Sequence, residues 1–262
     1  MTADPRWIRP DWPAPPNVRA LITTRAGGVS AFPYGAAPGV DKGLNLGLGA
    51  GDDPAAVLAN RARLHAALGS EPRWLRQVHG STVVDAATVI EPVAADASFT
   101  DAAGVVAVVM IADCMPVLLT DTRGRCVGIA HAGWRGLAAG VIQATVRTMR
   151  DRIGDPSAEL LAYLGPAIGP GHFEVGVEVM TAMREGLPRA ADAFVPAGPG
   201  KYFADLPELG RQALAKVGVS RIHGGRDCTY SEPDRFYSYR RDRVTGRHAA
   251  IIWKLSGHEG PV

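Results

Sequence analysis

The 262-residue sequence has few cysteines and lacks a long apolar segment. Its three cysteines, Cys114, Cys126 and Cys228, are odd in number and widely spaced, which argues against a disulfide framework and favours a reducing compartment. The longest apolar run, 102–112, is far shorter than the ~18 residues that a membrane-spanning helix needs. The proline-rich N-terminus has no apolar stretch typical of a signal peptide. We therefore expect a soluble, cytoplasmic protein with no membrane partner.

An excess of charge of one sign is also absent. Lysine and arginine total 28 and aspartate and glutamate total 26, so the net charge is +2 and nucleic acid is not an expected partner. Hydrophobic residues make up 47% and charged residues 21% of the chain, as in ordinary globular proteins. No internal repeat or low-complexity linker divides the sequence. One domain with a sizeable core is expected at this length.

Apolar strands alternate with amphipathic helices along the chain, which predicts an α/β protein with a sheet buried on both faces. A helix is expected from Asp53-Pro54 to Gly69, because aspartate caps helices, proline suits their first turn and glycine ends them. Its apolar face would carry Val57, Leu58, Leu64 and Leu68. Further helices are expected at 137–153 and 206–217, and strands at 74–78, 82–84, 105–111, 116–120, 126–130, 160–164 and 249–253.

Three expected strand ends carry a side chain that binds zinc well. These are His79 in the string QVHG, Cys114 in ADCMP and His131 in HAGWRG, and each is close to a glycine or a turn. A catalytic zinc site uses three protein ligands and one open position, which these three side chains would supply. Asp113 would accept a hydrogen bond that orients a ligand. The same residue types equally fit a metal-free Cys–His hydrolase, and each alone fits an ordinary core cysteine or hydrogen-bonded histidine.

Glycine-rich segments with arginine suggest an anion site near this centre. Arg25 precedes Gly27-Gly28 and Ser30, Arg135 stands just before a helix, and Arg240 with Arg241 adds two more cations. Backbone N–H groups, helix N-termini and guanidinium groups bind oxyanions, although each arginine also fits a solvated surface position. The GxxxxGK pattern of a Walker loop is absent. The stiff loop from Gly165 to Glu174, with its Gly-Pro steps, would either wall a flat pocket or serve as a rigid connector.

These strings occur in an order that resembles the YfiH-type purine nucleoside phosphorylases, a family long labelled laccase-domain or multi-copper polyphenol oxidoreductase proteins. The similarity spans about 21–253. It rests on TR-GGVS from Thr24, NLG from Asn45, QVHG, ADCMP, HAGWRG, GPAIGP from Gly165 and FYSYRR from Phe236.

The resemblance implies a zinc site made by His79, Cys114 and His131. It implies phosphorolysis of adenosine, inosine, guanosine and methylthioadenosine, deamination of adenosine, and a single-domain layered α/β (α+β) sandwich with mixed sheets. On this basis we expect an extension at 1–19, the catalytic domain at 20–255 and a tail at 256–262. Our candidates for substrate and phosphate contacts are Arg25, Ser30, Asn45, Arg135, Gly165 and Arg240.

The histidine content excludes the four-copper centre that the older family label suggests. Such an oxidase needs about ten histidines, many in HxH pairs, whereas this chain has seven and no such pair. His65 and His258 stand apart from the three metal strings. One site of this type would still take up copper adventitiously and show weak polyphenol oxidase activity.

Two other classes of protein stay open. In one, Cys114 is the nucleophile of a cysteine hydrolase or amidase, and the resemblance extends to peptidoglycan-editing members of the family. In the other, the chain binds metal without catalysis. The zinc enzyme would act on purine nucleosides and phosphate as a monomer or small homo-oligomer.

Overall fold

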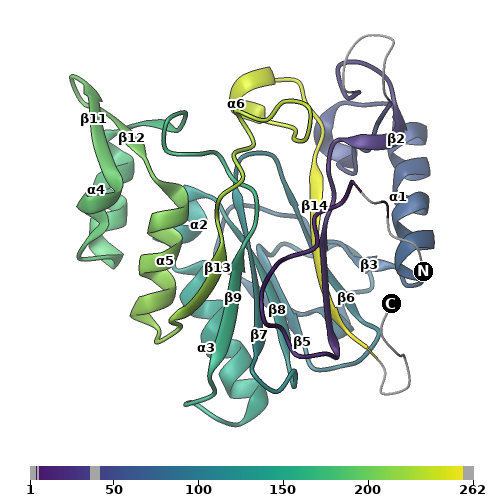
Figure 1. The fold of residues 1–262 in the computed structure, drawn as a ribbon, viewed down its shortest axis with the longest axis horizontal. Coiled ribbons are helices and arrows are strands. Elements are labelled where there is room, and N and C mark those ends of the chain that lie inside the picture. The colour runs from purple at the N-terminus through teal and green to yellow at the C-terminus, as the bar shows by residue number, and fades with distance from the viewer. Residues whose placement is uncertain (1–3, 5, 36–41, 256–262) are drawn as a thin grey trace.

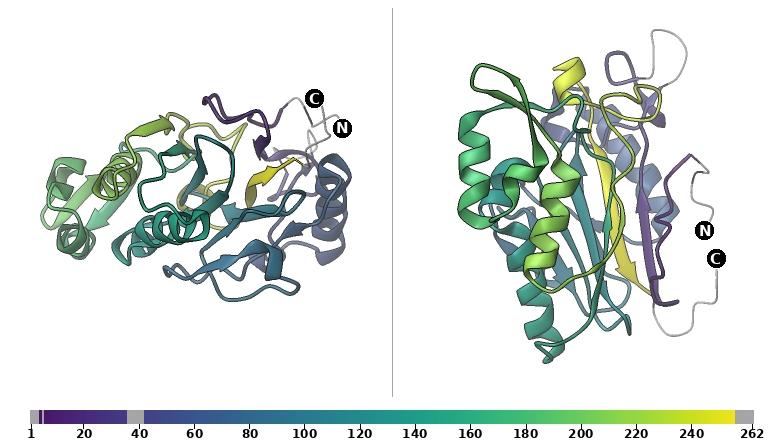
Figure 2. Two further views of the ribbon diagram at one scale, coloured as in Figure 1. Left: turned by 90° about the horizontal axis from the view of Figure 1, so that it is seen from below. Right: turned by 60° about the vertical axis from the view of Figure 1, so that its left-hand side comes forward.

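The computed structural model describes every residue except 1–3, 5, 36–41 and 256–262. The tail expected at 256–262, which includes His258, thus lies outside the described residues. Two β-sheets pack face to face, and helices cover both outer faces of the pair (Figures 1 and 2). The expectation of a single-domain α/β sandwich with mixed sheets is confirmed.

The larger sheet has six strands and holds the centre of the molecule. Its outer pairs are parallel and its inner neighbours antiparallel. Its order across the sheet is β13 (Arg221–Gly224), β9 (Leu160–Leu164), β7 (Met115–Asp121), β8 (Val127–Ala132), β5 (Ala97–Thr100) and β4 (Val83–Asp85).

The smaller sheet has four strands, β1 (Val18–Ile22), β14 (His248–Lys254), β6 (Val106–Ile111) and β3 (Pro72–Arg73). Side chains alternate across each strand, so Ala250 and Ile252 of β14 pack toward the six-stranded sheet, whereas Ala249 and Ile251 pack toward α1 (Pro54–Leu68). Both faces of β14 are therefore buried, which explains why the central strands β6, β7, β8, β9 and β14 are apolar at most positions.

Helices cover the far face of the six-stranded sheet. They are α2 (Trp134–Ala138), α3 (Val141–Ile153) and α5 (Leu206–Lys216). A three-stranded sheet extends from this side beside α4 (Val177–Gly186), with strands β10 (Glu174–Gly176), β12 (Lys201–Ala204) and β11 (Phe194–Gly198). The remaining elements are β2 (Ala26–Ser30), α6 (Tyr239–Asp242) and the 3-10 helices η1 (Leu48–Ala50), η2 (Ala86–Thr88) and η3 (Ala190–Ala193).

Most predicted elements lie where the sequence placed them, and three details were wrong. The strand expected at 74–78 is a loop after β3, with one isolated bridge at Arg76. The helix expected at 137–153 is interrupted at Gly140, whose φ of 82° ends one helix and starts the next. Leu58, expected on the buried face of α1, is 56% exposed.

The described part of the N-terminal segment packs on the smaller sheet. Trp7 is buried, and Ile8 forms an antiparallel bridge with Ile22 of β1. The boundaries at residues 19 and 255 stay predictions. No helix among the described residues is long and apolar enough to cross a bilayer.

Asn60 joins α1 to β2 and to the segment around Gly43 and Asn45. Its side-chain amide donates to Ser30 Oγ and to the carbonyl oxygens of Gly43 and Asn45, and its oxygen accepts from Val29 N. The side chain is completely buried, so every bond it loses leaves a polar group without water.

We expect Asn60→Ala to lower the free energy of unfolding by about 3 kcal/mol, because the two N–H groups and the oxygen of the amide are lost and each contributes roughly 1 kcal/mol. Urea denaturation would measure the loss. Asn17→Ala is the control, since Asn17 donates one bond, to Gly124 O, and is half-buried. Equal losses of unfolding free energy in the two variants would contradict the stabilising role of the Asn60 hydrogen bonds.

Candidate metal centre

His131 projects from the end of β8, where it pairs in register with Pro116 of β7. The imidazole is buried, and its Nδ1 lies 2.9 Å from Asp96 Oδ1. The His131 backbone N–H also donates to the Asp96 carbonyl oxygen at 2.7 Å. Because Asp96 immediately precedes β5, strand pairing itself brings this carboxylate to the histidine.

Cys114 directly precedes β7, so the antiparallel pairing of β7 with β8 places it beside the turn after His131. A Cβ added to Gly133 would lie 2.7 Å from Cys114 Sγ, so only glycine leaves room for the thiol there. Asp113 has a φ of 91°, a left-handed conformation that a residue without a special role rarely adopts. Its carboxylate accepts from Thr229 Oγ1 and Arg240 N, which fixes this turn.

His79 comes from the loop after β3, and two side chains hold that loop. The Asp96 carboxylate accepts from the backbone N–H groups of Val78, His79 and Gly80 at 3.1, 2.9 and 2.7 Å. Gln77 forms two bonds with the backbone of Met110 on β6. His79 itself has a φ of 61°. The loop is thus fixed in a conformation that turns the imidazole toward Cys114.

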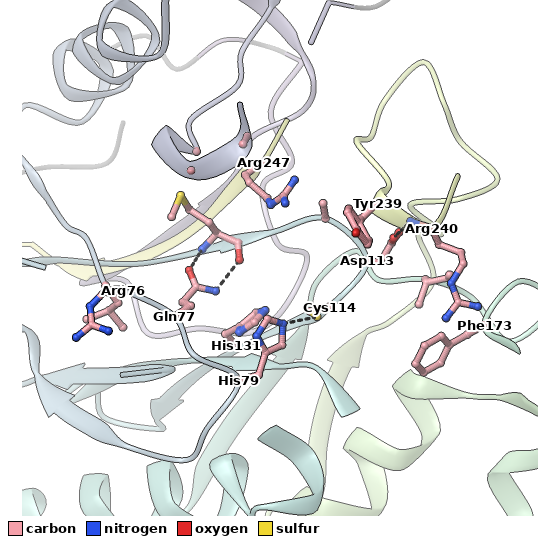
Figure 3. Close-up of a pocket in the computed structure, with 17 residues that line it drawn as sticks. Arg76, Gln77, His79, Asp113, Cys114, His131, Phe173, Tyr239, Arg240 and Arg247 are labelled. Carbon is pink, nitrogen blue, oxygen red and sulfur yellow. Dashed lines mark hydrogen bonds between the residues drawn. The ribbon is translucent and has the colours of Figure 1, made fainter. Parts of the chain in front are cut away.

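The three side chains converge. Their ligand atoms all lie within 4.8 Å of one another, and Cys114 Sγ is 3.8 Å from His79 Nε2 (Figure 3). A tetrahedral ion with bonds of ~2.0–2.3 Å holds its ligand atoms roughly 3.3–3.8 Å apart. One thiolate and two imidazoles are a donor set that suits zinc or copper. The residues present therefore fit a bound metal.

The electrostatics of the centre favour a charged cysteine. Burial raises the pKa of the Cys114 thiol, but the neighbouring His131 and hydrogen bonds from both imidazoles outweigh it and lower the pKa to about 6. Burial lowers the pKa of His131, whereas Cys114 and Asp96 raise it to about 9. Burial also raises the pKa of Asp96, but hydrogen bonds from His131, Gly80 and Val78 hold it below its usual value.

A cavity of about 650 Å³ opens over the three side chains. This volume is in the range of small-molecule sites. Side chains from both sheets and from the loops around α6 and η1 enclose it. Its apolar wall includes Leu75, Met110, Ala112, Ile168 and Phe173, with Tyr239 at the rim.

Three arginines, Arg76, Arg240 and Arg247, line the cavity, against one carboxylate, Asp113. Arg240 donates from NH1 to the Glu174 carbonyl oxygen and stacks over Phe173. Arg247 donates to the carbonyl oxygens of its two preceding residues, and burial lowers its pKa. The cavity wall is therefore positively charged and suited to an anion.

Of the six candidate substrate contacts, only Arg240 lines the cavity. Arg25 is only 6% exposed and lies away from the cavity, where its guanidinium donates to the carbonyl oxygens of Pro233 and Gly35. Ser30 is buried and accepts from Asn60. Both residues hold the glycine-rich segment in place.

The other three candidates also lie outside the cavity lining. Asn45 Oδ1 accepts from the backbone N–H of Arg247, so it supports a cavity arginine indirectly. Arg135 is exposed and stacks on Trp134. A Cβ on Gly165 would lie 2.6 Å from Pro116, so this glycine serves close packing.

Asp96, Arg76 and Arg247 are the residues of this region that the sequence analysis missed. We expected Asp113 to orient a ligand, but it is Asp96 that hydrogen-bonds the His131 imidazole. The available signal for Asp96 was a lone carboxylate between alanines immediately before an apolar strand. Arg247 had a similar signal, because it stands between glycine and the closing strand.

Comparison with known proteins adds a family assignment to this geometry. Residues 19–255 match the family model described as multi-copper polyphenol oxidoreductase laccase. The chain belongs to this family. Among the described residues, however, His79, Cys114 and His131 form the one cluster of three or more metal-binding side chains.

Curated relatives and solved structures cover nearly the whole chain. A purine nucleoside phosphorylase of Pseudomonas aeruginosa is 51% identical over 94% of this chain and 98% of its own length. Purine nucleoside phosphorylase YfiH of Escherichia coli is 49% identical over 95% and 98%. The crystal structure of a Neisseria meningitidis protein has a TM-score of 0.89 at 46% identity and covers 96% of this chain and 100% of its own. These similarities confirm the YfiH-type resemblance.

In the metal-free protein, Cys114 should react with iodoacetamide as a thiolate above pH 6, because its pKa is lowered to about that value. The rate of alkylation against pH, followed by mass spectrometry, would give the midpoint. His131→Gln removes the neighbouring positive charge and should move the midpoint upward. Cys114→Ala identifies the signal of this thiol, and a wild-type midpoint near the usual ~8.5 would contradict the assignment.

Proposed function

We propose that this chain is a zinc-dependent purine nucleoside phosphorylase that also deaminates adenosine, in the cytoplasm. The observation that carries the proposal is the position of His79, Cys114 and His131 on the floor of a cavity whose wall presents Arg76, Arg240 and Arg247. The names of the relatives support the substrate class. Phosphorolysis of adenosine, inosine, guanosine and methylthioadenosine would give the free base and a pentose 1-phosphate.

Zinc is the proposed metal because thiolate and imidazole are its preferred ligands, and copper would be an adventitious occupant of the same atoms. When bound, the ion supplies Lewis-acid chemistry. His79, Cys114 and His131 would hold it, and Asp96 would keep His131 in orientation.

Phosphorolysis requires the chain to hold an anion beside a sugar and to accommodate a flat base. Arg240 and Arg247 would bind phosphate, and their charge would offset its repulsion in a cavity partly closed to water. Phe173 and the apolar wall would contact the purine and the pentose. One phosphate oxygen then bonds to the anomeric carbon as the glycosidic bond breaks, and the departing nitrogen of the base takes up a proton.

Deamination of adenosine by this chain would use a site unlike that of the common zinc deaminases. Their H-x-E and P-C-x-x-C strings are absent from the sequence. The lone cysteine and two histidines here come from three separate segments. This activity therefore needs its own assay.

We expect purified protein to release hypoxanthine from inosine, and adenine from adenosine, only when inorganic phosphate is present. Chromatography of the reaction mixture would measure the base and the ribose 1-phosphate, and inosine formed from adenosine would report deamination. Cys114→Ala should lose bound zinc and all of these activities together, because it removes the only thiolate ligand.

Cys228→Ser is the control for this variant, since Cys228 lies outside the cavity lining and its sulfur contacts Gly169 N. It should keep zinc and activity. Base release without phosphate would exclude a phosphorylase, and full zinc content in Cys114→Ala would exclude the ligand assignment.

Arg247→Gln should raise the KM for phosphate about 10- to 100-fold, because a charge-assisted hydrogen bond contributes roughly 1.5–3 kcal/mol. Initial rates at varied phosphate and fixed inosine would give this value. Arg189→Gln is the control, since Arg189 is on the surface and pairs with Asp192. An unchanged KM for phosphate in Arg247→Gln would place the anion elsewhere in the cavity.

A cysteine hydrolase is the second candidate, and one observation favours it. Cys114, His131 and Asp96 follow one another as thiol, imidazole and carboxylate, with the lowered pKa of the thiol that a nucleophile needs. The substrate would be an amide, such as a peptidoglycan precursor. A covalent adduct on Cys114 in metal-free protein with an amide substrate would support this candidate over the phosphorylase.

A further inference from the structure

The Asp96 side chain hydrogen-bonds both segments that carry the histidines, the loop of His79 and the end of β8 with His131. Its side chain is fully buried and accepts four hydrogen bonds. Three come from the backbone N–H groups of the loop that carries His79, and the fourth involves His131 Nδ1. Asp96 Oδ2 accepts from the N–H groups of Val78 and Gly80, whereas Oδ1 accepts from His79 N and His131 Nδ1.

A carboxylate accepts hydrogen bonds and donates none. The nitrogen of His131 that faces Asp96 must therefore be the donor, which leaves the lone pair of a neutral ring on Nε2. Nε2 is the nitrogen on the side of Cys114, since Nδ1 is already bonded to Asp96. The same carboxylate fixes the backbone of His79.

We propose that Asp96 is a positioning residue for both imidazole ligands: it sets the tautomer of His131 and the direction of His79. This inference rests on the proposed zinc site. The Asp96 carboxylate, which belongs to neither of the segments that carry His79 and His131, thus orients two of the three proposed ligands.

The Asp96→Asn variant has almost the same shape but cannot satisfy all four partners. With its amide nitrogen toward His79 and His131, it loses the His79 N–H bond and donates to His131 Nδ1. The proton of a neutral His131 then moves to Nε2, which can no longer bind an ion. In the opposite orientation the amide nitrogen of the variant side chain would face the N–H groups of Val78 and Gly80. Donor would then meet donor, and both of these hydrogen bonds would be lost. The first orientation loses fewer bonds, so we expect the tautomer to change.

The primary test is the zinc affinity of the purified protein, measured by competition with a chromophoric chelator. Asp96→Asn should bind zinc about 10- to 100-fold more weakly than wild type, as expected when the partner of a ligating histidine is lost. Asp121→Asn is the matched control. Asp121 is also a fully buried carboxylate that accepts backbone N–H groups, from Arg125 and Cys126, but it lies at the other end of β7.

Nitrogen NMR of the histidine rings provides a readout that a general loss of stability does not change. In metal-free wild type, in alkaline buffer where the ring is neutral, His131 should carry its proton on Nδ1. In Asp96→Asn the proton should be on Nε2, and in Asp121→Asn it should stay on Nδ1. The wild-type measurement needs no variant, so it tests the proposal even where Asp96→Asn does not fold.

Two results would overturn the role of Asp96: equal zinc affinities in Asp96→Asn and Asp121→Asn, or a wild-type His131 protonated on Nε2. Failure of wild type to bind zinc is a different result. It would reject the proposed zinc enzyme, whereas the ring protonation in metal-free protein would still decide what Asp96 does.

Discussion

The carboxylate of Asp96 is the contact on which the geometry of the centre depends, because it joins the His79 loop to His131, which no strand pairing among the described residues joins directly. The β7–β8 ladder alone brings Cys114 and His131 to one end of the six-stranded sheet. His79 comes from a loop after β3 of the neighbouring sheet, and this loop is held by Gln77 and by Asp96, which immediately precedes β5 and accepts the His79 backbone N–H. A buried carboxylate with four partners tolerates little displacement, since each lost bond would leave a polar group unpaired.

This dependence explains why the three candidate ligands could be singled out from the sequence but the residues that hold them in place could not. His79, Cys114 and His131 belong to residue types with a known affinity for metals, and each stands in a short, distinctive string. Asp96 has neither advantage, because a lone aspartate before a strand looks like any turn residue. Its role arises from the antiparallel pairing of β5 with β8, which places Ala97 opposite Ala130. Sequence spacing carries no record of that register.

For the arginines, the residue type pointed to anion binding, but the sequence did not show which arginine faces the cavity. Arg25 and Arg247 both stand next to glycine-containing sequence, and in the structure Arg25 is buried and Arg247 half-buried. In the structure, backbone carbonyl oxygens of two other segments surround the Arg25 guanidinium, whereas Arg247 reaches the cavity. Arg25 follows β1 and Arg247 precedes β14, so the position of each arginine depends on how these distant strands pair, which the local sequence does not record. The alternation of strands and helices, by contrast, is written into the local pattern, so the α/β class and most elements were predictable.

The same geometry suits a metal ligand set and a thiol–imidazole–carboxylate triad, because both require an imidazole held by an acceptor and turned toward a sulfur. What separates the two is His79. A catalytic triad does not require a second imidazole 3.8 Å from the thiol, nor a His79 backbone held at a φ of 61°. A metal site needs a third donor at this distance, and the loop around Gly80 is built to supply it. The strained, doubly anchored position of His79 is therefore the feature that favours the metal enzyme over the hydrolase.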